Sequence, residues 1–328
     1  AMAQPGIDME QEDPTRAAVI FGAGIGGIDE LQNGFYTLHD KGPKRVSPLF
    51  VPTMIGNIAA GHLAIRYGMR GECIDVTTAC ATGAHNIGAA VRSIRHGYAD
   101  MALAGGSEES VNPICIAGFA NLGALAKVDD PAQASLPFDE RRCGFVAGEG
   151  AGAVVLESLE HALARGAKPL AEVTGFGSTG DAYHMTAPEP SGEGIQRAML
   201  QALSEGGFTP ADLGHVNAHG TATPANDSTE SHALLALCGE EEGRKVPVVS
   251  VKGTTGHTLG AAGAVEAIVT ALSVANECVP PTTGFAQPDP DCPVNVLTEA
   301  KTGYPQKVAL SNSLGFGGHN AVLAISPC

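Results

Sequence analysis

The stretch DVTTACATGAHNIGAA, residues 75–90, joins two runs of different character and sets a single cysteine, Cys80, between them. The β-branched residues 76–78 favour an extended backbone, as in a strand. Beyond Gly83 the apolar residues recur at steps of three and four, which predicts a buried helix over residues 83–96. Cys80 is therefore expected where a strand gives way to a helix N-terminus, a position that favours a thiolate. The alternative is a small buried hydrophobic residue, as free cysteines commonly are.

The rest of the chain alternates between strand-like and helix-like runs, which is typical of an α/β fold with sheets covered by helices. Both halves end in similar hairpin-like pairs of strands, so the pattern predicts a duplicated architecture with a joint near residues 162–172. Strands are expected at residues 17–24, 72–78, 100–108, 152–158, 171–179, 215–220, 246–252, 307–313 and 321–326. Further helices are expected near residues 193–206, 226–239 and 258–276.

Composition and charge exclude several functional classes. The formal net charge is -16, which argues against nucleic acid as the main partner because phosphate binding needs a basic surface. The eight cysteines have no CxxC pair and no regular spacing, so we expect reduced thiols and a cytoplasmic protein. No apolar run approaches the roughly 18 residues of a membrane span, and the first residues lack the pattern of a signal peptide.

The segment AAVIFGAGIGGI, residues 17–28, contains G-x-G-x-x-G as Gly22, Gly24 and Gly27 directly after an expected strand. Such a loop can bind the pyrophosphate of a dinucleotide, provided that a helix and a second strand with an acidic end follow. The next residues are polar and rich in turn formers, and two prolines interrupt them. We therefore expect no helix there, and glycines that pack a strand against its neighbours rather than a nicotinamide or flavin site.

Two histidines lie in glycine-rich loops of the second half, each between an expected strand and an expected helix. His219 ends one strand, and His257 lies between Lys252 and Glu266 in the sequence. Because α/β folds gather their sites at the carboxyl ends of strands, we expect these residues and Cys80 to converge. Each has a structural alternative: an ordinary buried histidine, a Lys252–Glu266 ion pair, or a turn. A zinc site of Cys80 with the two histidines is a further alternative, although they form no short-spaced ligand pair.

Six motifs occur in one order along the chain: TTACATG, PFDERRCGFVAGEGAGAVVLE, DAYHMTAPEP, VNAHGTATPANDSTE, VKGTTGHTLGAAGAVEA and NSLGFGGHNAV. In these motifs the chain resembles, over essentially its whole length, the β-ketoacyl-acyl-carrier-protein synthases of the elongating type II, members of the thiolase-like condensing enzymes. The resemblance implies that Cys80 is the acylated nucleophile and that His219 and His257 are the catalytic histidines. It further implies that Lys252 supports them with Glu266 as its partner.

The last of these motifs carries Phe316 between two glycines, just after an expected strand. A loop of this kind can present backbone N–H groups to an oxyanion. By resemblance, Phe316 gates the pocket, and its N–H shares an oxyanion hole with the N–H of Cys80.

The resemblance implies a fold and a reaction. The fold is a thiolase-like α/β arrangement of two duplicated halves in α-β-α-β-α layers, with the nucleophile in residues 1–165 and the two histidines in residues 166–328. The reaction is decarboxylative Claisen condensation of malonyl-acyl carrier protein with a cysteine-bound acyl group, which extends the chain by two carbons in fatty-acid synthesis. Such an acyltransferase needs no cofactor and no metal, because its substrates are carried on the phosphopantetheine of acyl carrier protein.

Further residues take binding roles by the same resemblance. Thr221 and Thr223 bind the phosphopantetheine arm. Ile25 and Phe119 line an acyl tunnel in which Ile25 limits chain length, with ordinary core packing as the alternative. A homodimer is expected, with no nucleic-acid or membrane partner. The candidate docking charges for the acidic carrier protein are Lys44, Arg45 and Lys127.

The chain departs from the family pattern mainly at its front, where roughly eighty residues of the pattern are absent, so we expect the N-terminal half to lack its first strand and to expose an unpaired edge. Two competing interpretations remain. One is a polyketide or specialised-lipid ketosynthase with the same chemistry. The other is a non-catalytic partner subunit. The intact set of Cys80, His219 and His257 argues against this second interpretation.

Overall fold

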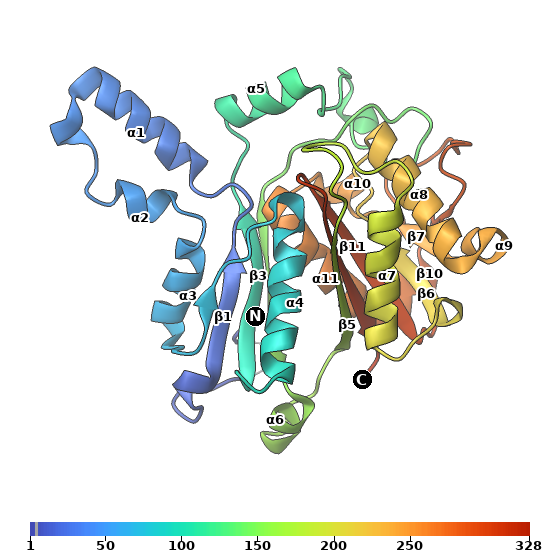
Figure 1. Cartoon of the computed structure of the whole chain (residues 1–328), viewed down its shortest axis with the longest axis horizontal. Helices are drawn as coiled ribbons and strands as arrows, with labels where there is room; N and C mark the ends of the chain where they lie inside the picture. The colour runs from blue at the N-terminus through green and yellow to red at the C-terminus, as the bar shows by residue number, and fades with distance from the viewer. Residues whose placement is uncertain (4–5) are drawn as a thin grey trace.

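The computed structural model describes residues 1–3 and 6–328, and its helices and sheets are stacked in layers (Figure 1). The helices α4 (Thr82–Arg95) and α11 (Ala262–Ala275) pack against strands of both sheets and form the middle layer. The outer layers are α3 (Ile58–Tyr67) on the first sheet and α7 (Glu193–Glu205) on the second. The predicted α-β-α-β-α arrangement is confirmed.

Each half of the chain supplies one of the two main sheets. The first has the order β2-β1-β3-β4, in which only β4 runs antiparallel to its neighbour. The second has the order β5-β12-β11-β6-β7-β9, in which β12 runs antiparallel to both β5 and β11 and the remaining pairs are parallel. The strands are β1 (Ala17–Gly22), β2 (Cys73–Ile74), β3 (Met101–Glu108), β4 (Gly150–Glu157), β5 (Glu172–Gly180), β6 (Leu213–Asn217), β7 (Pro247–Val249), β9 (Asn295–Val296), β11 (Val308–Gly315) and β12 (His319–Ser326), and β8 (Cys278–Val279) pairs separately with β10 (Lys301–Thr302).

Alternation along the strands decides which side chains enter which layer. Successive side chains of a strand point to opposite faces. In β1, Ala18 and Ile20 join the cluster of the middle layer, whereas Val19 and Phe21 pack with residues of α3. All residues of β1 are buried, as expected for a strand covered on both faces.

The two halves repeat the same local plan. An antiparallel strand pair, β3–β4 or β11–β12, follows α4 or α11 in the chain. A 3-10 turn, η3 (Ala79–Ala81) or η6 (Leu259–Ala261), precedes each of these helices, and its first residue has a positive φ of 51° or 47°. β5 covers the outer edge of β12, whereas no strand in the described residues pairs with the outer edge of β4. β4 therefore has an open edge, in line with the expectation from the sequence.

Several elements differ from those expected, and two of them test particular predictions. A helix, α1 (Ile28–Lys41), does follow the glycine-rich loop, so the prediction of no helix there is wrong. It buries none of its residues and projects from the body together with α2 (Phe50–Met54), in blue at the upper left of Figure 1. The strand expected at residues 72–78 is reduced to β2, because the N–H of Val76 donates to the Asn86 side chain at 2.8 Å instead of to a neighbouring strand.

The remaining helices are mostly short or lie at the surface, except α8 (Pro224–Cys238), which has 15 residues and buries eight of them. None of the helices in residues 1–3 and 6–328 combines the length and apolar character that crossing a membrane requires. The helices not yet named are α5 (Pro113–Leu122), α6 (Leu159–Ala164), α9 (Glu240–Gly243) and α10 (Lys252–Thr255). The 3-10 turns not yet named are η1 (Pro14–Arg16), η2 (Pro43–Arg45), η4 (Pro131–Gln133) and η5 (Pro210–Asp212).

Candidate active site

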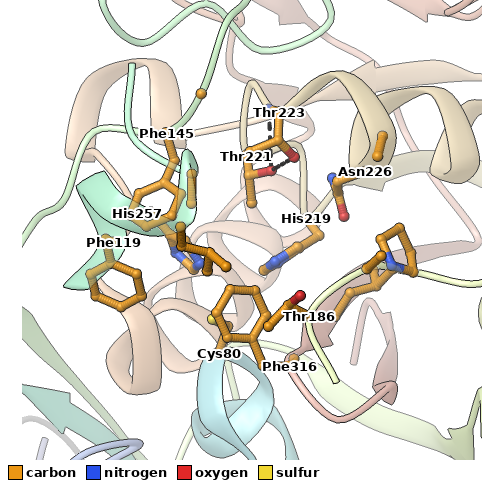
Figure 2. A pocket seen from close by; sticks show the side chains of 18 of the residues that line it. Cys80, Phe119, Phe145, Thr186, His219, Thr221, Thr223, Asn226, His257 and Phe316 are labelled. Atoms are coloured by element: carbon orange, nitrogen blue, oxygen red, sulfur yellow. Dashed lines mark hydrogen bonds between the residues drawn. The ribbon is translucent and has the colours of Figure 1, made fainter. Parts of the chain in front are cut away.

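Cys80 lies in the turn η3, between the extended residues before it and the N-terminus of α4. The Thr82 hydroxyl holds this turn: it accepts from the Thr78 N–H at 2.9 Å and donates to the Ala79 carbonyl at 2.8 Å. Ala79 has its φ of 51° in the left-handed region, which non-glycine residues rarely adopt. The turn presents the Cys80 side chain to a cavity (Figure 2).

His219 follows β6, and groups from two other elements fix it. Glu230 of α8 accepts from the N–H groups of His219 and Gly220 at 2.8 and 2.9 Å. Lys252 Nζ donates to the His219 carbonyl at 2.6 Å and lies 3.3 Å from Nδ1 of the ring. An ammonium group has no lone pair to offer, so Nδ1 is the acceptor and His219 carries its proton on Nε2. The ring points into the cavity, where Nε2–H is a hydrogen-bond donor (Figure 2).

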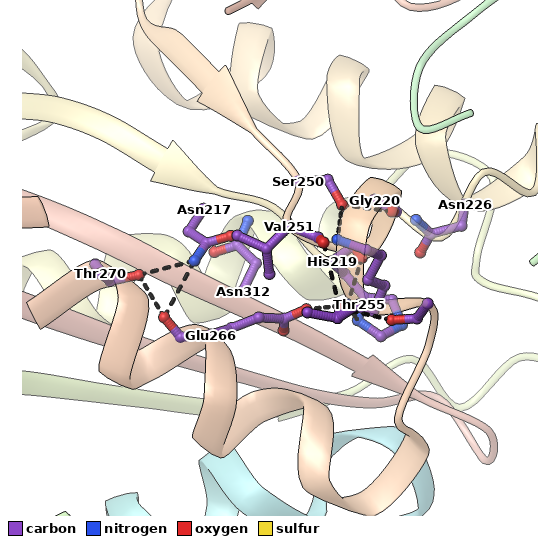
Figure 3. A network of polar contacts seen from close by, with 12 residues as sticks. Asn217, His219, Gly220, Asn226, Ser250, Val251, Thr255, Glu266, Thr270 and Asn312 are labelled. Carbon is purple, nitrogen blue, oxygen red and sulfur yellow. Dashed lines mark hydrogen bonds and ion pairs between the residues drawn. The ribbon is translucent and has the colours of Figure 1, made fainter. Parts of the chain in front are cut away.

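A buried network of polar contacts lies behind His219 (Figure 3). Lys252 and Glu266 form an ion pair in which each side chain is only 1% exposed. Burial raises the pKa of Glu266, and the Lys252 ammonium opposes that shift. Asn312 of β11 donates to Glu230 at 3.0 Å and so ties the network to the second sheet. The ring of His219 is thereby held by charged groups that are themselves immobilised.

His257 lies between α10 and η6, and its N–H donates to the Val146 carbonyl at 2.7 Å. Its ring is nearly perpendicular to those of His219 and Phe145, with centroids 5.2 Å away in both pairs. Burial, reinforced by the charge of Lys252, lowers the pKa of both histidines well below the ordinary value. Both imidazoles are therefore neutral at physiological pH, and two uncharged rings meet at the cavity wall.

The electrostatics of Cys80 differ from the expectation. Burial raises the pKa of Cys80 to about 12; the charge of Lys252 lowers it, that of Glu108 raises it, and hydrogen bonds from the backbone N–H groups of Phe316 and Cys80 lower it. The direction of this shift runs against the expectation of a readily formed thiolate, because desolvation of the buried sulfur is the largest influence on its pKa. Both N–H groups nevertheless lie beside the sulfur, next to which the oxygen of an attacked thioester would come to lie.

These groups share one cavity of about 390 Å³, whose wall is mainly apolar near Cys80. The Thr221 and Thr223 hydroxyls are 2.8 Å apart on its rim (Figure 2). The cavity brings together these residues that the sequence singled out: Cys80, Phe119, His219, Thr221, Thr223, His257 and Phe316.

Other predicted site residues lie outside the cavity lining. Lys252 and Glu266 lie behind His219 rather than in the wall. Ile25 is 44% exposed and does not line the cavity. Three exposed cations lie at the surface, two of them in η2 beside α1: Lys44, Arg45 and Lys127.

The zinc alternative has no geometric support. In the described part of the chain, no three His, Cys, Asp or Glu side chains converge as a metal-ligand set. The Lys252 ammonium, which lies beside Nδ1 of His219, would in addition repel a second cation.

Comparison with known proteins agrees with this geometry. Two family models match: "Beta-ketoacyl synthase, N-terminal domain" over residues 1–162 and "Beta-ketoacyl synthase, C-terminal domain" over residues 170–286. The chain belongs to the beta-ketoacyl synthase family. Among the curated relatives of this synthase, 3-oxoacyl-acyl-carrier-protein synthase 2 of Vibrio harveyi is 46% identical over 98% of this chain and 78% of the relative. The protein of the same name from Rhizobium meliloti is 48% identical over 99% of this chain and 77% of the relative.

Solved structures give the same fold. A ketosynthase bound to a hexaketide, in complex with a type II PKS acyl-carrier protein, superposes with a TM-score of 0.95 at 33% identity. The match covers 100% of this chain and 82% of that ketosynthase. The beta-ketoacyl synthase fold thus accounts for both layers of strands and for the position of the cavity between the halves.

Two contributors to the site of this synthase were missed at the sequence level. Glu230 bonds to the backbone at His219, and Phe145 packs its ring against His257. A signal for Glu230 was present, because the motif that contains His219 ends with this acidic residue on an expected helix. Phe145 carried no comparable signal, since an aromatic residue in a glycine-rich segment is as often part of the core.

Proposed function

We propose that the protein catalyses decarboxylative Claisen condensation of malonyl-acyl carrier protein with an acyl group held on Cys80, and so extends the acyl chain in fatty-acid synthesis. The observation that carries the proposal is the convergence of one thiol and two neutral imidazoles on a single apolar cavity. The names of the curated relatives, which are 3-oxoacyl-acyl-carrier-protein synthases, support the same reaction.

In the first half-reaction, the sulfur of Cys80 attacks the thioester carbonyl of an acyl carrier protein. The carbonyl oxygen gains negative charge in the tetrahedral intermediate, where the N–H groups of Cys80 and Phe316 hydrogen-bond to it. The C–S bond to the pantetheine then breaks. The proton from the Cys80 thiol leaves with the pantetheine sulfur as a free thiol, so that no net charge stays in the cavity.

In the second half-reaction, a malonyl thioester occupies the vacated channel. Nε2–H of His219 hydrogen-bonds to its thioester oxygen, and His257 is the second donor. The bond to the carboxylate breaks, carbon dioxide leaves, and the electron pair remains as an enolate that the two donors stabilise. The enolate carbon attacks acyl-Cys80 and expels the sulfur as a thiolate, which takes a proton from water. The carbanion comes from the departing carboxylate, so the sequence of steps balances without a cofactor.

The two halves divide this work. Residues 1–165 supply the nucleophile and residues 166–328 supply both imidazoles, which is the domain organisation that we propose. Phe119 lies in the wall and is assigned to the acyl tunnel. Ile25 does not line the cavity in the single chain, so its assignment to the distal end of the tunnel rests on the resemblance and requires a second copy to cover it.

The carrier protein would deliver its arm past Thr221 and Thr223 at the rim, and Lys44, Arg45 and Lys127 would meet its acidic surface. The complex of a related ketosynthase with its acyl-carrier protein supports such a partner. Electrostatic steering weakens with salt, so the affinity for the carrier protein should fall as ionic strength rises. An affinity that is independent of ionic strength would contradict the docking assignment.

We propose a homodimer and a cytoplasmic location. The arm of α1 and α2 buries no residue within its own chain, and several of its large apolar side chains face solvent, among them Phe35, Tyr36, Leu49 and Val51. An apolar surface of this kind suits a second copy. The cysteines are free, in keeping with a reducing compartment. Sedimentation equilibrium should give twice the chain mass, and Phe35→Asp with Val51→Asp should shift the mass toward the monomer.

A type II polyketide ketosynthase is the second candidate, favoured by the close superposition on the hexaketide-bound enzyme. Acyl carrier proteins of both pathways, supplied side by side with the same acyl group, distinguish the two. Faster condensation on the fatty-acid carrier supports our proposal, and faster condensation on the polyketide carrier supports the second candidate.

The test of the reaction uses two variants with opposite losses. Cys80→Ala should lose condensation and retain release of carbon dioxide from malonyl carrier protein, whereas His257→Ala should lose that release. Cys278→Ala, in the remote strand β8, is the matched control and should behave as the parent. Acyl-chain elongation by Cys80→Ala would overturn the proposal.

A further inference from the structure

The glycine-rich loop after β1 surrounds an anion that the chain itself supplies. The N–H groups of Gly24, Ile25 and Gly26 point at the carboxylate of Glu108, the last residue of β3, at 2.9, 3.1 and 3.3 Å. The N–H of Gly260 in η6 reaches the same carboxylate at 3.0 Å. Glu108 is 4% exposed. These N–H groups therefore hold a buried carboxylate where a dinucleotide loop would hold a phosphate.

The two carboxylate oxygens have different tasks. Oε2 accepts from Gly24 and from Gly260, and so it joins a loop of the first half to a turn of the second. Oε1 accepts from Ile25 and Gly26 and fixes the rest of the loop, and the Ile25 N–H is shared with Oε2 at 3.2 Å. One side chain thus links three segments that are far apart in the sequence.

Close glycine packing brings this linkage against the nucleophile turn. A Cβ added at Gly24 would lie 2.9 Å from the Ala79 carbonyl oxygen, and one added at Gly260 would lie 2.3 Å from the Gly24 nitrogen. Ala79 directly precedes Cys80, and Gly260 directly follows Leu259. Cys80 and Leu259 belong to one apolar cluster and both line the cavity. Glu108 therefore lies behind both walls at the reacting sulfur.

The charge of Glu108 also acts on the sulfur. Lys252 favours the thiolate of Cys80, and Glu108 opposes it. The other titratable groups facing the sulfur, His219 and His257, are neutral and do not alter this balance.

We propose that Glu108 is a positioning residue for the chemistry at Cys80: it locks the glycine-rich loop and η6 behind the nucleophile turn. This role of Glu108 rests on the proposed function, because it concerns acyl transfer to Cys80. Without the lock, the strained turn at Ala79 and the wall at Leu259 lose their common support. A displacement of about 1 Å at a reacting group can reduce the rate about 10²-fold.

Two substitutions of Glu108 distinguish the effect of its charge from that of its side-chain length. Glu108→Gln removes the charge and keeps an oxygen for Gly24 and Gly260, although its amide group then meets the N–H groups of Ile25 and Gly26. Glu108→Asp keeps the charge and shortens the side chain by one methylene, so that it cannot reach all four donors. The matched control is Asp139→Asn, a buried carboxylate remote from Cys80 that accepts from the N–H groups of Ala286 and Gln287 at 2.7 and 2.8 Å.

Two measurements are made on the full chain of each variant. The first is the rate at which iodoacetamide alkylates Cys80 as a function of pH, followed by mass spectrometry of the peptide; it requires no carrier protein. The second is kcat and KM for acyl transfer to Cys80. We expect Glu108→Gln to alkylate several-fold faster near neutral pH, with its profile displaced to lower pH. We expect Glu108→Asp to keep the parental alkylation profile and to lose about 10-fold or more in kcat with little change in KM.

The control variant, a failed role of Glu108 and a failed function of the protein give different results in these measurements. Asp139→Asn should lower the urea midpoint and leave both the alkylation profile and kcat unchanged. A parental kcat in Glu108→Asp overturns the positioning role of Glu108, and a parental alkylation profile in Glu108→Gln overturns its effect on the pKa of Cys80. If Glu108→Gln does not fold, kcat of Glu108→Asp decides. Absence of acyl transfer in the parent protein instead refutes the proposed function, while the alkylation measurement still tests the charge effect.

Discussion

The buried pair of Lys252 and Glu266 gives the sharpest prediction, because stability and activity should respond differently to its removal. Lys252→Met leaves the Glu266 carboxylate buried without the ammonium, and its second oxygen has no hydrogen-bond partner among the described residues. Breaking a buried pair by removing one partner costs about 3–5 kcal/mol in the free energy of unfolding. The double variant Lys252→Met/Glu266→Leu removes both charges. Its remaining destabilisation comes from the lost hydrogen bond between the ammonium and the His219 carbonyl, which costs about 1–3 kcal/mol in the free energy of unfolding.

Activity should not recover in the same way. Lys252 Nζ, 3.3 Å from Nδ1 of His219, is what keeps the proton of that ring on Nε2. Both the single and the double variant lack this contact, so both should lose about 10²–10³-fold in decarboxylation, the usual effect of losing one preorganised donor. The restored stability of the double variant makes this loss interpretable, since a folded protein then lacks only the fixed tautomer.

The assays follow from the composition. The chain has no tryptophan, so urea unfolding is followed by far-ultraviolet circular dichroism. Decarboxylation is followed as release of labelled carbon dioxide from malonyl carrier protein. A double variant that decarboxylates at the parental rate would refute the reasoning, because Lys252 would then only balance the charge of Glu266. A single variant as stable as the parent would refute the claim that the pair is mutually compensated.

Three further outcomes can be checked. Because the lowered pKa values keep His219 and His257 neutral, decarboxylation should vary less than about 2-fold between pH 8.5 and pH 6.5, and a loss of half the rate at pH 6.5 would contradict this. Burial acts to lower the pKa of His161, but hydrogen bonds to two carboxylates act in the opposite direction and raise this pKa overall. The contribution of His161 to the stability of the fold is therefore complete below about pH 6.5 and disappears as the pH rises through the raised pKa. In urea unfolding, His161→Gln should remove roughly 1 kcal/mol of this pH dependence. In Gly315→Ala the new Cβ would lie 2.4 Å from the Thr78 carbonyl oxygen, so labelling of the nucleophile by an acyl thioester should fall about 10-fold or more, and parental labelling would show that the turn can yield.

The sequence predicted the elements whose pattern reflects burial and missed those that bury little. The junction at Cys80 was predicted because hydrophobic periodicity changes there, and α4 indeed begins at Thr82. α1 was missed because turn formers and polar residues interrupt its segment, and its apolar residues at helical spacing, Leu31, Phe35 and Leu38, are exposed rather than buried in this chain. α5 was missed for a different reason: its residues are apolar all round, so no period distinguishes a helix from a loop.

The site was predicted as a set of residues but not as an arrangement. Motif order singled out His219, His257 and Lys252, which the structure places beside one another. It did not reveal the tautomer of His219, which depends on a contact between residues 33 positions apart. Nor did it reveal the raised pKa of Cys80: a helix N-terminus is visible in the sequence, whereas the burial that raises this pKa is a property of the folded chain.

The alanine-rich layer between the sheets bears on how the chain acquires its structure. In one cluster Ala18 and Ile20 of β1 pack together with Leu323 and Ile325 of β12, so strands from opposite ends of the described chain complete the same interior. Contacts of such long sequence separation form late, because a large loop must close before they are gained. During synthesis on the ribosome, the nucleophile turn would therefore wait with one side uncovered until β12 emerges. In that state the apolar strands of a nascent chain would be exposed to chaperones or to other chains before the substrate cavity has formed.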